Sequence, residues 1–291
     1  MKRQATTITA AFAALCGAAL YTTDSLARDA TPDPELVVTS DIEWGPLNPA
    51  RGNKGPKAGT LWGDRTAEGP SGFLVEFADG FASPPHIHNV TYRGVVIRGL
   101  VHNDDPNAAE MWMPPGSFWT QPVGEEHITA GKGGKSLAYI EIEKGPYLVK
   151  PSEEAYDSGE RPVNVDPSNI VWLDASNLGA IETNAPSDGP QIAYLWGNPQ
   201  DNQRNGTLVK LPAGFTGTLR SQGTSFRAVV IEGQPRYHTA DKSTVTSLEP
   251  GNYVGGEGKR EFTLSAEANN ATLLYVRAEG NFEILATPAA E

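Results

Sequence analysis

Two histidines placed two positions apart raise the question of chemistry in this sequence. They are His86 and His88, in the stretch SPPHIHNVTYRG at residues 83–94. Residues two apart in an extended strand point to the same face, so this segment can present two imidazoles side by side. His127 lies further along the chain, and neutral imidazole is a common metal ligand. The spacing therefore indicates a metal site, if the fold brings the histidines together.

The elements that must position these histidines occur twice in the chain. GTLWGD at 59–64 recurs as AYLWGN at 193–198, and GFLVEFADGF at 72–81 recurs as GTLVKLPAGF at 206–215, both with an offset of 134. Both copies contain short apolar runs between turn residues, which is typical of antiparallel β structure. We expect two units, at 35–150 and 169–287, joined by a polar linker at 151–168.

The histidines do not follow this repeat. At the positions aligned with the three histidines, the second unit has Arg220, Gln222 and Phe262. A purely structural role would more often be kept in both halves of a repeat. Because the scaffold is duplicated and the imidazoles are not, we expect one half alone to carry chemistry.

Two segments of the first unit match the motifs of a known family. The first is GFASPPHIH at 80–88, with five residues between its first glycine and the H-x-H pair. The second is GSFWTQPVGEEH at 116–127, with a P-x-G turn before its histidine. These segments resemble the two motifs of the cupin superfamily, and the doubled unit resembles bacterial bicupins of unknown function. The resemblance implies an all-β fold of two tandem cupin jelly-roll barrels with one metal site.

One position departs from the usual cupin pattern. That pattern has a glutamate shortly after the H-x-H pair, and Tyr92 occupies its place here. A similar replacement is found in cupins with a three-histidine centre, such as the diketone-cleaving dioxygenases and the cysteine dioxygenase-like cupins. The resemblance therefore implies that His86, His88 and His127 hold one divalent ion, which could be Fe, Zn, Mn or Ni.

Three neutral imidazoles leave the charge of a divalent ion uncompensated. Such a centre favours anionic or enolisable ligands that chelate through two oxygens, and it keeps positions open for substrate and for O₂ or water. Three functions are compatible with this site. They are a dioxygenase-like enzyme acting on a small carbonyl-bearing or acidic molecule, a hydrolase or isomerase using metal-bound water, and a non-catalytic metal-binding or sensing module. A fourth protein ligand would indicate the sensing module, and a site without metal would indicate a vestigial barrel.

Further candidates follow from their places in the pattern. Tyr92 aligns with Phe226, so both repeats have an aromatic ring here but only the first has a hydroxyl. This hydroxyl could form a hydrogen bond to a metal-bound ligand or act as an acid. Candidates for a hydrogen bond to the ligand imidazoles, or for a fourth ligand, are His102, Glu76, Glu110 and Glu141, the last because its repeat partner is Arg277. Candidates for the substrate pocket are Arg98, Trp112 and Trp119.

The first residues have the features of an export signal. MKR is a basic start, ITAAFAALCGAAL is apolar but too short to span a membrane, and SLA before Arg28 is a cleavage pattern. Removal of residues 1–27 would leave no cysteine, because Cys16 is the only one. We therefore expect a periplasmic or secreted protein without a membrane span, either monomer or homodimer. The formal net charge of −12 argues against nucleic acid and anionic membrane surfaces as partners. The expected partner is the small-molecule substrate or ligand of the metal site.

Overall fold

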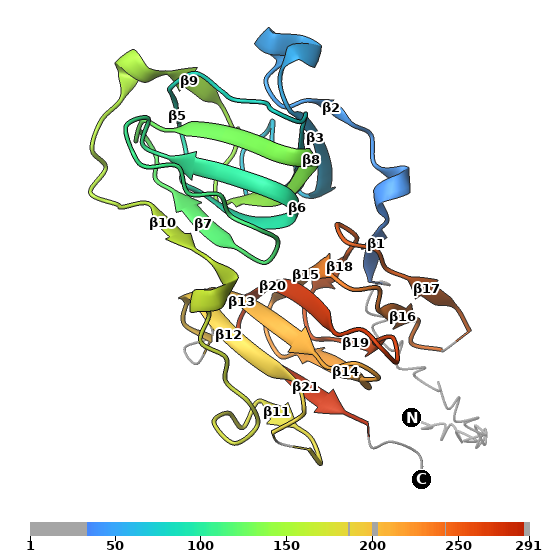
Figure 1. The fold of residues 1–291 in the computed structure, drawn as a ribbon. Coiled ribbons are helices and arrows are strands. Elements are labelled where there is room, and N and C mark those ends of the chain that lie inside the picture. Colours follow the sequence, from blue (N-terminus) through green and yellow to red (C-terminus); the bar gives the residue numbers. More distant parts are fainter. Residues whose placement is uncertain (1–33, 186, 200–202, 242, 288–291) are drawn as a thin grey trace, which may run out of the picture. The chain divides into compact units, whose positions relative to one another are not determined.

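The computed structural model describes residues 34–185, 187–199, 203–241 and 243–287. The predicted signal peptide at 1–27 lies outside these residues. The described chain consists almost entirely of strands and their connections (Figure 1). Its helices are the short 3-10 turns η1 (Thr39–Asp41), η2 (Pro49–Lys54), η3 (Ser152–Glu154) and η4 (Pro167–Asn169). Within the described ranges, no helix has the length and apolar character needed to cross a membrane.

The first unit is built on a seven-stranded sheet with the order β10-β7-β6-β8-β4-β3-β2. The bounds are β2 (Gly45–Pro46), β3 (Lys57–Trp62), β4 (Ser71–Phe77), β6 (Tyr92–Asp104), β7 (Phe118–Gln121), β8 (Ile128–Ile142) and β10 (Val163–Val165). A separate pair consists of β5 (His86–His88) and β9 (Val149–Pro151). The long strands β6 and β8 pair along their length and shift register around Gly99, whose φ of 73° suits glycine.

The second unit contains two six-stranded sheets. The first has the order β1-β18-β15-β20-β13-β12, with β1 (Glu35–Val37), β12 (Gln191–Gly197), β13 (Arg204–Leu211), β15 (Ser225–Glu232), β18 (Tyr253–Glu257) and β20 (Thr272–Glu279). The second has the order β11-β21-β14-β19-β16-β17, with β11 (Ile181–Glu182), β14 (Thr216–Ser221), β16 (Arg236–His238), β17 (Val245–Ser247), β19 (Arg260–Ser265) and β21 (Phe282–Ala286). In the first unit, the continuous strands β6 and β8 run through both layers and join them in one sheet. In the second unit, the corresponding strands are interrupted between β15 and β16 and between β19 and β20, so the two layers form separate sheets. The all-β jelly-roll expectation is confirmed.

Two short strands pair in ways that the predicted bounds do not indicate. β1 falls in the 35–150 segment by sequence, yet it pairs with β18, so that Leu36 lies opposite Val254. β10 falls in the predicted linker, yet it pairs with β7, so that Asn164 lies opposite Trp119. Through backbone hydrogen bonds, β1 ties the first segment to the second unit and β10 ties the linker to the first unit. Hydrophobic patterning alone predicts neither pairing.

Three apolar clusters hold the structure together. One fills the second unit, including Phe226 and Phe262, and another fills the first unit, including Phe73 and Trp119. The third contains residues of both units, such as Trp62 and Tyr253. Burial of apolar surface is the main stabilising contribution in each cluster, so the two units share part of their core.

The two units make matching contacts at their interface, as if related by an approximate two-fold axis. Indole N–H groups donate to tyrosine hydroxyls in both halves, Trp62 to Tyr139 at 3.0 Å and Trp196 to Tyr275 at 2.9 Å. Two cation–π contacts run in opposite directions, from Arg93 to Trp196 at 3.8 Å and from Arg227 to Trp62 at 4.5 Å. Reciprocal contacts of this kind are characteristic of an isologous interface.

Candidate metal centre

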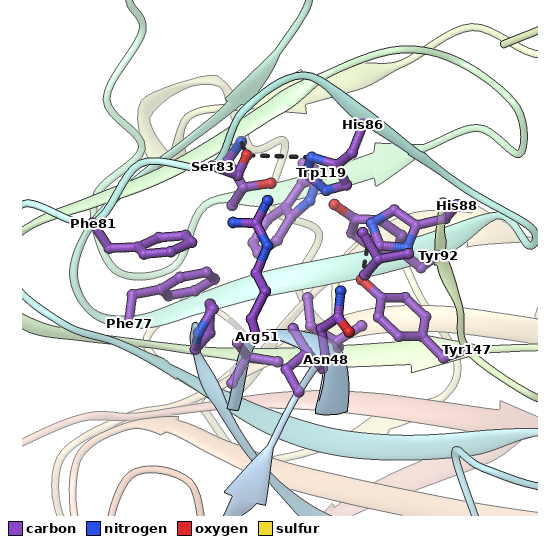
Figure 2. A pocket seen from close by; sticks show the side chains of 16 residues that line it. Asn48, Arg51, Phe77, Phe81, Ser83, His86, His88, Tyr92, Trp119 and Tyr147 are labelled. Carbon is purple, nitrogen blue, oxygen red and sulfur yellow. Dashed lines mark hydrogen bonds between the residues drawn. The ribbon is translucent and has the colours of Figure 1, made fainter. Parts of the chain in front are cut away.

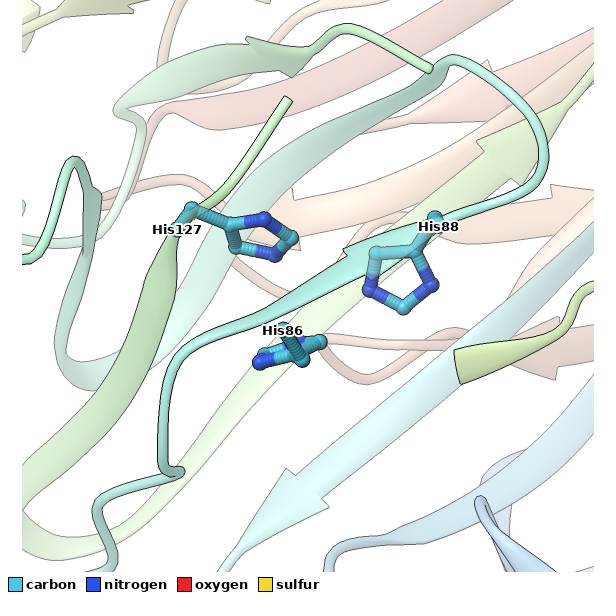
Figure 3. Close-up of side chains that lie close together, drawn as sticks. All are labelled: His86, His88 and His127. Atoms are coloured by element: carbon cyan, nitrogen blue, oxygen red, sulfur yellow. The ribbon is translucent and has the colours of Figure 1, made fainter. Parts of the chain in front are cut away.

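Three imidazoles converge on one point of the first unit (Figure 3). His86 and His88 are on β5, and His127 immediately precedes β8. The backbones of His86 and His127 exchange two N–H···O hydrogen bonds of 3.0 Å, which fixes the second motif beside the first. One ring nitrogen from each histidine lies within 4.8 Å of those from the other two, and all three side chains are buried. The H-x-H pair therefore presents both imidazoles to one face, as its spacing predicts.

Backbone carbonyls determine which ring nitrogen of each histidine faces the centre. The Nδ1 atoms lie next to carbonyl oxygens, with His86 3.0 Å from Pro84, His88 3.1 Å from Leu148 and His127 3.2 Å from Glu125. A carbonyl oxygen only accepts, so each Nδ1 carries the proton and donates it. Each Nε2 then carries no proton, which is the tautomer that metal ligation through Nε2 requires.

Burial also keeps the three imidazoles neutral. Desolvation, with the nearby His86, lowers the pKa of His127 to about 3. Desolvation and the two other histidines lower the pKa of His88 well below its usual range. The pKa of His86 is lowered by burial and, to a smaller extent, by the positive charge of Arg51. Since imidazole must be neutral to bind a metal, and imidazole nitrogens suit first-row transition ions, the donor set fits such an ion.

Two of these histidines, His86 and His88, line a cavity with mostly apolar walls (Figure 2). The apolar lining side chains are Leu47, Pro56, Val75, Phe77, Phe81, Trp119, Ile140 and Val149. Among the lining residues that the structure describes, Arg51 carries the only permanent charge, and none is acidic. A mostly apolar cavity with a few polar groups at one end is typical of a small-molecule site.

Tyr92 contacts the centre through a buried polar network. Its hydroxyl donates to Oδ1 of Asn103 at 2.8 Å and lies 3.5 Å from Nε2 of His127. Thr129 donates to the same Asn103 oxygen at 2.8 Å. Burial raises the pKa of Tyr92, so its hydroxyl stays protonated. In this arrangement the hydroxyl proton is directed at Asn103. The expected roles of Tyr92, bonding a metal-bound ligand or acting as an acid, stay predictions.

Sequence reasoning missed a second tyrosine at the centre. The hydroxyl of Tyr147 lies 3.2 Å from Nε2 of His88, and burial raises its pKa. Its repeat counterpart is Phe282, because LAYIEIEKG at 137–145 aligns with LLYVRAEG at 273–280 and each aromatic residue follows two positions later. The signal that identified Tyr92 therefore also applies to Tyr147. The correspondence holds in space. The rings of Tyr92 and Tyr147 are 5.8 Å apart at 72°, and those of Phe226 and Phe282 are 5.6 Å apart at 74°.

The structure also corrects the alignment of the H-x-H segment with the second unit. His86 lies opposite His127, and Phe262, the counterpart of His127, lies opposite Leu219. The counterparts of His86 and His88 are therefore the buried Leu219 and Ser221, one residue before those aligned by sequence. Arg220 faces the other side and pairs with Glu261, since a one-residue slip reverses every side chain of a strand.

Glu76 and Arg98 do not face the centre. Val75 and Phe77 line the cavity, so the intervening Glu76 points to the opposite face of β4. There its carboxylate is 3.7 Å from Arg98 and 3.6 Å from Lys135. Both residues form a surface ion-pair cluster instead of the expected contacts with metal or substrate.

His102, Glu110 and Trp112 form another group away from the centre. Nδ1 of His102 lies 3.0 Å from the carbonyl of Met111, and Trp112 donates to Glu110 at 3.0 Å. Lys132 covers the Trp112 ring at 3.7 Å. His102 is adjacent to Asn103, whose side chain faces Tyr92, so alternation along β6 directs the two side chains to opposite faces.

Glu141 lies between the two units and not beside the histidines. It is fully buried, and its carboxylate accepts hydrogen bonds from Tyr139 at 3.1 Å and Tyr275 at 2.8 Å. Arg277, its repeat counterpart, is 3.6 Å away. If both repeats had a glutamate here, the two carboxylates would face each other across the interface and repel. The replacement of glutamate by arginine in the second repeat therefore reflects the interface between the units and not the metal site.

Comparison with known proteins supports the fold. The chain matches the family described as a domain of unknown function, DUF4437, over residues 35–285. No curated protein sequence shows significant similarity to the chain.

Several solved structures resemble the chain. One is a protein from Nostoc punctiforme provisionally described as a dioxygenase, with a TM-score of 0.62 and 14% identity, covering 91% of this chain and 90% of that one. Another is a variant of oxalate decarboxylase from Bacillus subtilis, with a TM-score of 0.50 and 12% identity, covering 88% and 80%. Vicilin from hazelnut (Corylus avellana) has a TM-score of 0.52 and 11% identity, covering 86% and 87%. At these identities the similarity concerns the fold and not the reaction. With its two cupin barrels, the chain belongs to the DUF4437 family.

Proposed function

We propose that the protein is an exported, mononuclear metal enzyme of the dioxygenase-like type, acting on a small carbonyl-bearing or acidic molecule. The observation that carries this proposal is the set of three buried imidazoles, whose Nδ1 protons are held by backbone carbonyls and whose Nε2 atoms converge beside a cavity. His86, His88 and His127 would hold the ion. When bound, a redox-active ion would supply Lewis acidity and open positions for substrate and O₂.

The residues around the ligands have separate tasks in this proposal. Phe77, Phe81 and Trp119 provide apolar walls that restrict water around the reacting groups. The Tyr147 hydroxyl can donate to Nε2 of His88 only while that lone pair is free. In the loaded protein the proton would turn toward a bound ligand, because hydroxyl hydrogens rotate to suit their acceptor.

The enzyme proposal is preferred over a closed metal sensor. Within the described residues, no further histidine, cysteine or carboxylate side chain joins the three-histidine cluster. His102 and the three glutamates considered for a fourth ligand have other partners. A centre with three protein ligands keeps positions for exogenous molecules, which catalysis requires.

Metal content is the first test of this proposal. The mature protein, purified without added metal, should contain about one transition-metal ion per chain, and His88→Ala should lose it. His238→Ala is the matched control because this histidine, in the second unit, bonds Ser265 instead. Bound iron should then be accompanied by oxygen uptake with β-diketones. A wild-type protein that takes up neither Fe, Zn, Mn nor Ni at pH 7.5 would contradict the proposal.

Export rests on the sequence features of residues 1–27 and needs its own measurement. We expect the protein in the periplasmic or secreted fraction of its native cells, with an N-terminus that follows Ala27. An intact N-terminus in the cytoplasmic fraction would overturn this part of the proposal without affecting the metal site.

A further inference from the structure

Arg51 is held at the mouth of the cavity by a structured connection. It belongs to η2, within the segment 48–55 that joins β2 to β3. The Leu47 N–H donates to the Pro56 carbonyl at 2.8 Å and closes the base of this segment. The Asn48 side chain accepts from the Ala50 N–H at 3.0 Å and caps the turn. These bonds fix the backbone from which the Arg51 side chain extends.

The Arg51 guanidinium enters the cavity without a protein partner. Figure 2 shows its side chain extending among the lining residues, toward the side where Ser83 and His86 lie. It is half-buried, and in the described part of the chain its guanidinium forms no ion pair or hydrogen bond. Several other buried or half-buried arginines pair with carboxylates, as Arg93 and Arg277 do with Glu143. Sheltered guanidinium groups are normally paired, so this one is available to a ligand.

The charges around the cavity favour an anion. Three neutral imidazoles would leave a divalent ion with its full charge, and Arg51 adds another positive charge. Among the lining residues that the structure describes, none supplies a carboxylate. The excess positive charge is therefore local, in a protein whose formal net charge is −12. Within a mostly apolar cavity such charges act over short distances with little screening.

We infer that Arg51 binds the carboxylate of a small organic acid whose carbonyl oxygen reaches the metal centre. This inference rests on the proposed function, because it assigns the substrate class of the same site. The planar guanidinium can form two parallel hydrogen bonds to a carboxylate, which orients the acid as well as holding it. The apolar body of the acid would lie against Phe77 and Phe81, on the walls of the same cavity.

The repeat supports a role for Arg51 in the site. An offset of 134 aligns the segments on both sides of the connection, and it places Ala185 opposite Arg51. The arginine is thus confined to the unit that carries the histidines, as the Tyr147 hydroxyl is. An arginine that only stabilised this connection would have no reason to occur solely in the unit that carries the three clustered histidines.

The test compares two ligands that differ in charge and only slightly in size. Protein loaded with Co²⁺ is titrated with 2,4-dioxopentanoate and with its methyl ester, and binding is followed by the visible spectrum of the ion and by calorimetry. Wild-type protein should bind the acid roughly 10- to 100-fold more tightly than the ester. Arg51→Met should lose this preference while retaining Co²⁺ and its affinity for the ester. Arg98→Met removes the same charge outside the cavity and should leave the preference unchanged.

The outcomes separate this inference from the proposed function. Protein that does not hold Co²⁺ would contradict the metal site itself. Protein that holds Co²⁺ but binds acid and ester equally, or keeps its preference in Arg51→Met, would overturn the role of Arg51 alone. Inorganic phosphate that competes as strongly as the acid, in an Arg51-dependent way, would overturn the carboxylate class. Circular dichroism of Arg51→Met confirms that the variant is folded.

Discussion

The ring of Tyr147 stacks on the imidazole of His88, with centroids 4.5 Å apart, and its hydroxyl lies 3.2 Å from Nε2 of the same histidine. Residues from β5 and from the segment before β9 therefore meet at the candidate metal centre. The contact places a protonated hydroxyl where a bound ligand would lie.

Removing the Tyr147 hydroxyl should weaken ligand binding without removing the metal. Tyr147→Phe keeps the stacked ring, and Phe282 shows that the fold accepts this ring at the equivalent position. We expect unchanged metal content and an affinity for chelating ligands about three- to tenfold lower, as for loss of one neutral hydrogen bond. Calorimetry on the loaded protein measures this effect. Tyr156→Phe, at a tyrosine that is 55% exposed, is the control and should bind like wild type.

The metal-free protein should lose stability as the pH falls below about 6.5. The pKa of His127 is lowered to about 3 by burial, and that of His88 is also lowered. Between the folded pKa and the unfolded value of about 6.5, the unfolded state binds more protons, so the free energy of unfolding rises with pH. Urea unfolding of chelator-treated protein at several pH values measures the slope.

His127→Phe tests whether the histidines cause that slope. The second unit has Phe262 at this place, so the replacement suits the fold. Between pH 4 and 6.5 the variant should show a shallower pH dependence than wild type, because one proton-binding group of the unfolded state is gone. Equal slopes for the two proteins would show that other groups cause the dependence.

The buried charges between the units should be sensitive to removal of a single partner. Arg277→Met would leave the fully buried Glu141 without its cation, at a cost of about 3–5 kcal/mol in the free energy of unfolding. Removing both charges in Glu141→Gln/Arg277→Met should restore part of this loss. Arg161→Met breaks a solvent-exposed pair with Asp157, so it should lower the free energy of unfolding far less. A loss in Arg277→Met no larger than in this control would contradict the prediction.

Glu143, which belongs to the same group of charges between the units, should cause a second loss of stability at acidic pH. Burial by itself would raise the pKa of Glu143. The hydrogen bond and charge of Arg277, together with the charges of Arg93 and Arg204, outweigh burial and lower this pKa to about 2. A lowered carboxyl pKa contributes stability above the unfolded value, and that stability is lost as pH falls toward 2. Glu143→Gln should reduce the acid sensitivity of the protein below about pH 4.5. Thermal melts across this range, compared with wild type, provide the measurement.

Packing beside the cavity should tolerate no added methyl at Gly94. A Cβ there would overlap the ring of Trp119, which is 1% exposed and lines the cavity. Gly94→Ala should therefore destabilise the protein by about 1–3 kcal/mol, measured by chemical unfolding. Gly45→Ala is the matched control, since a Cβ at Gly45 has no neighbour within 4 Å. If Gly94→Ala has the same free energy of unfolding as wild type, the Trp119 ring must be able to move aside.

The sequence determined the features that depend on short-range pattern. The spacing of His86 and His88 fixed their common face, and the repeat showed that the first unit alone carries the three histidines of the H-x-H pair and the second motif. The motif around His127 predicted its place beside them. These properties follow from strand periodicity and from the order of the strands, which the chain encodes locally.

The tertiary structure decided what depends on contacts between distant segments. It brought Tyr147 to the centre and Arg51 into the adjoining cavity, both from segments that lack a local motif. It placed Glu141 at the interface between the units instead of at the expected metal site. It also set the true register of the second unit, where Leu219 and Ser221, not Arg220 and Gln222, stand in the histidines' places. The physical reason is that strand pairing and barrel packing select which residues meet, and a shift of one residue reverses the face that each side chain occupies.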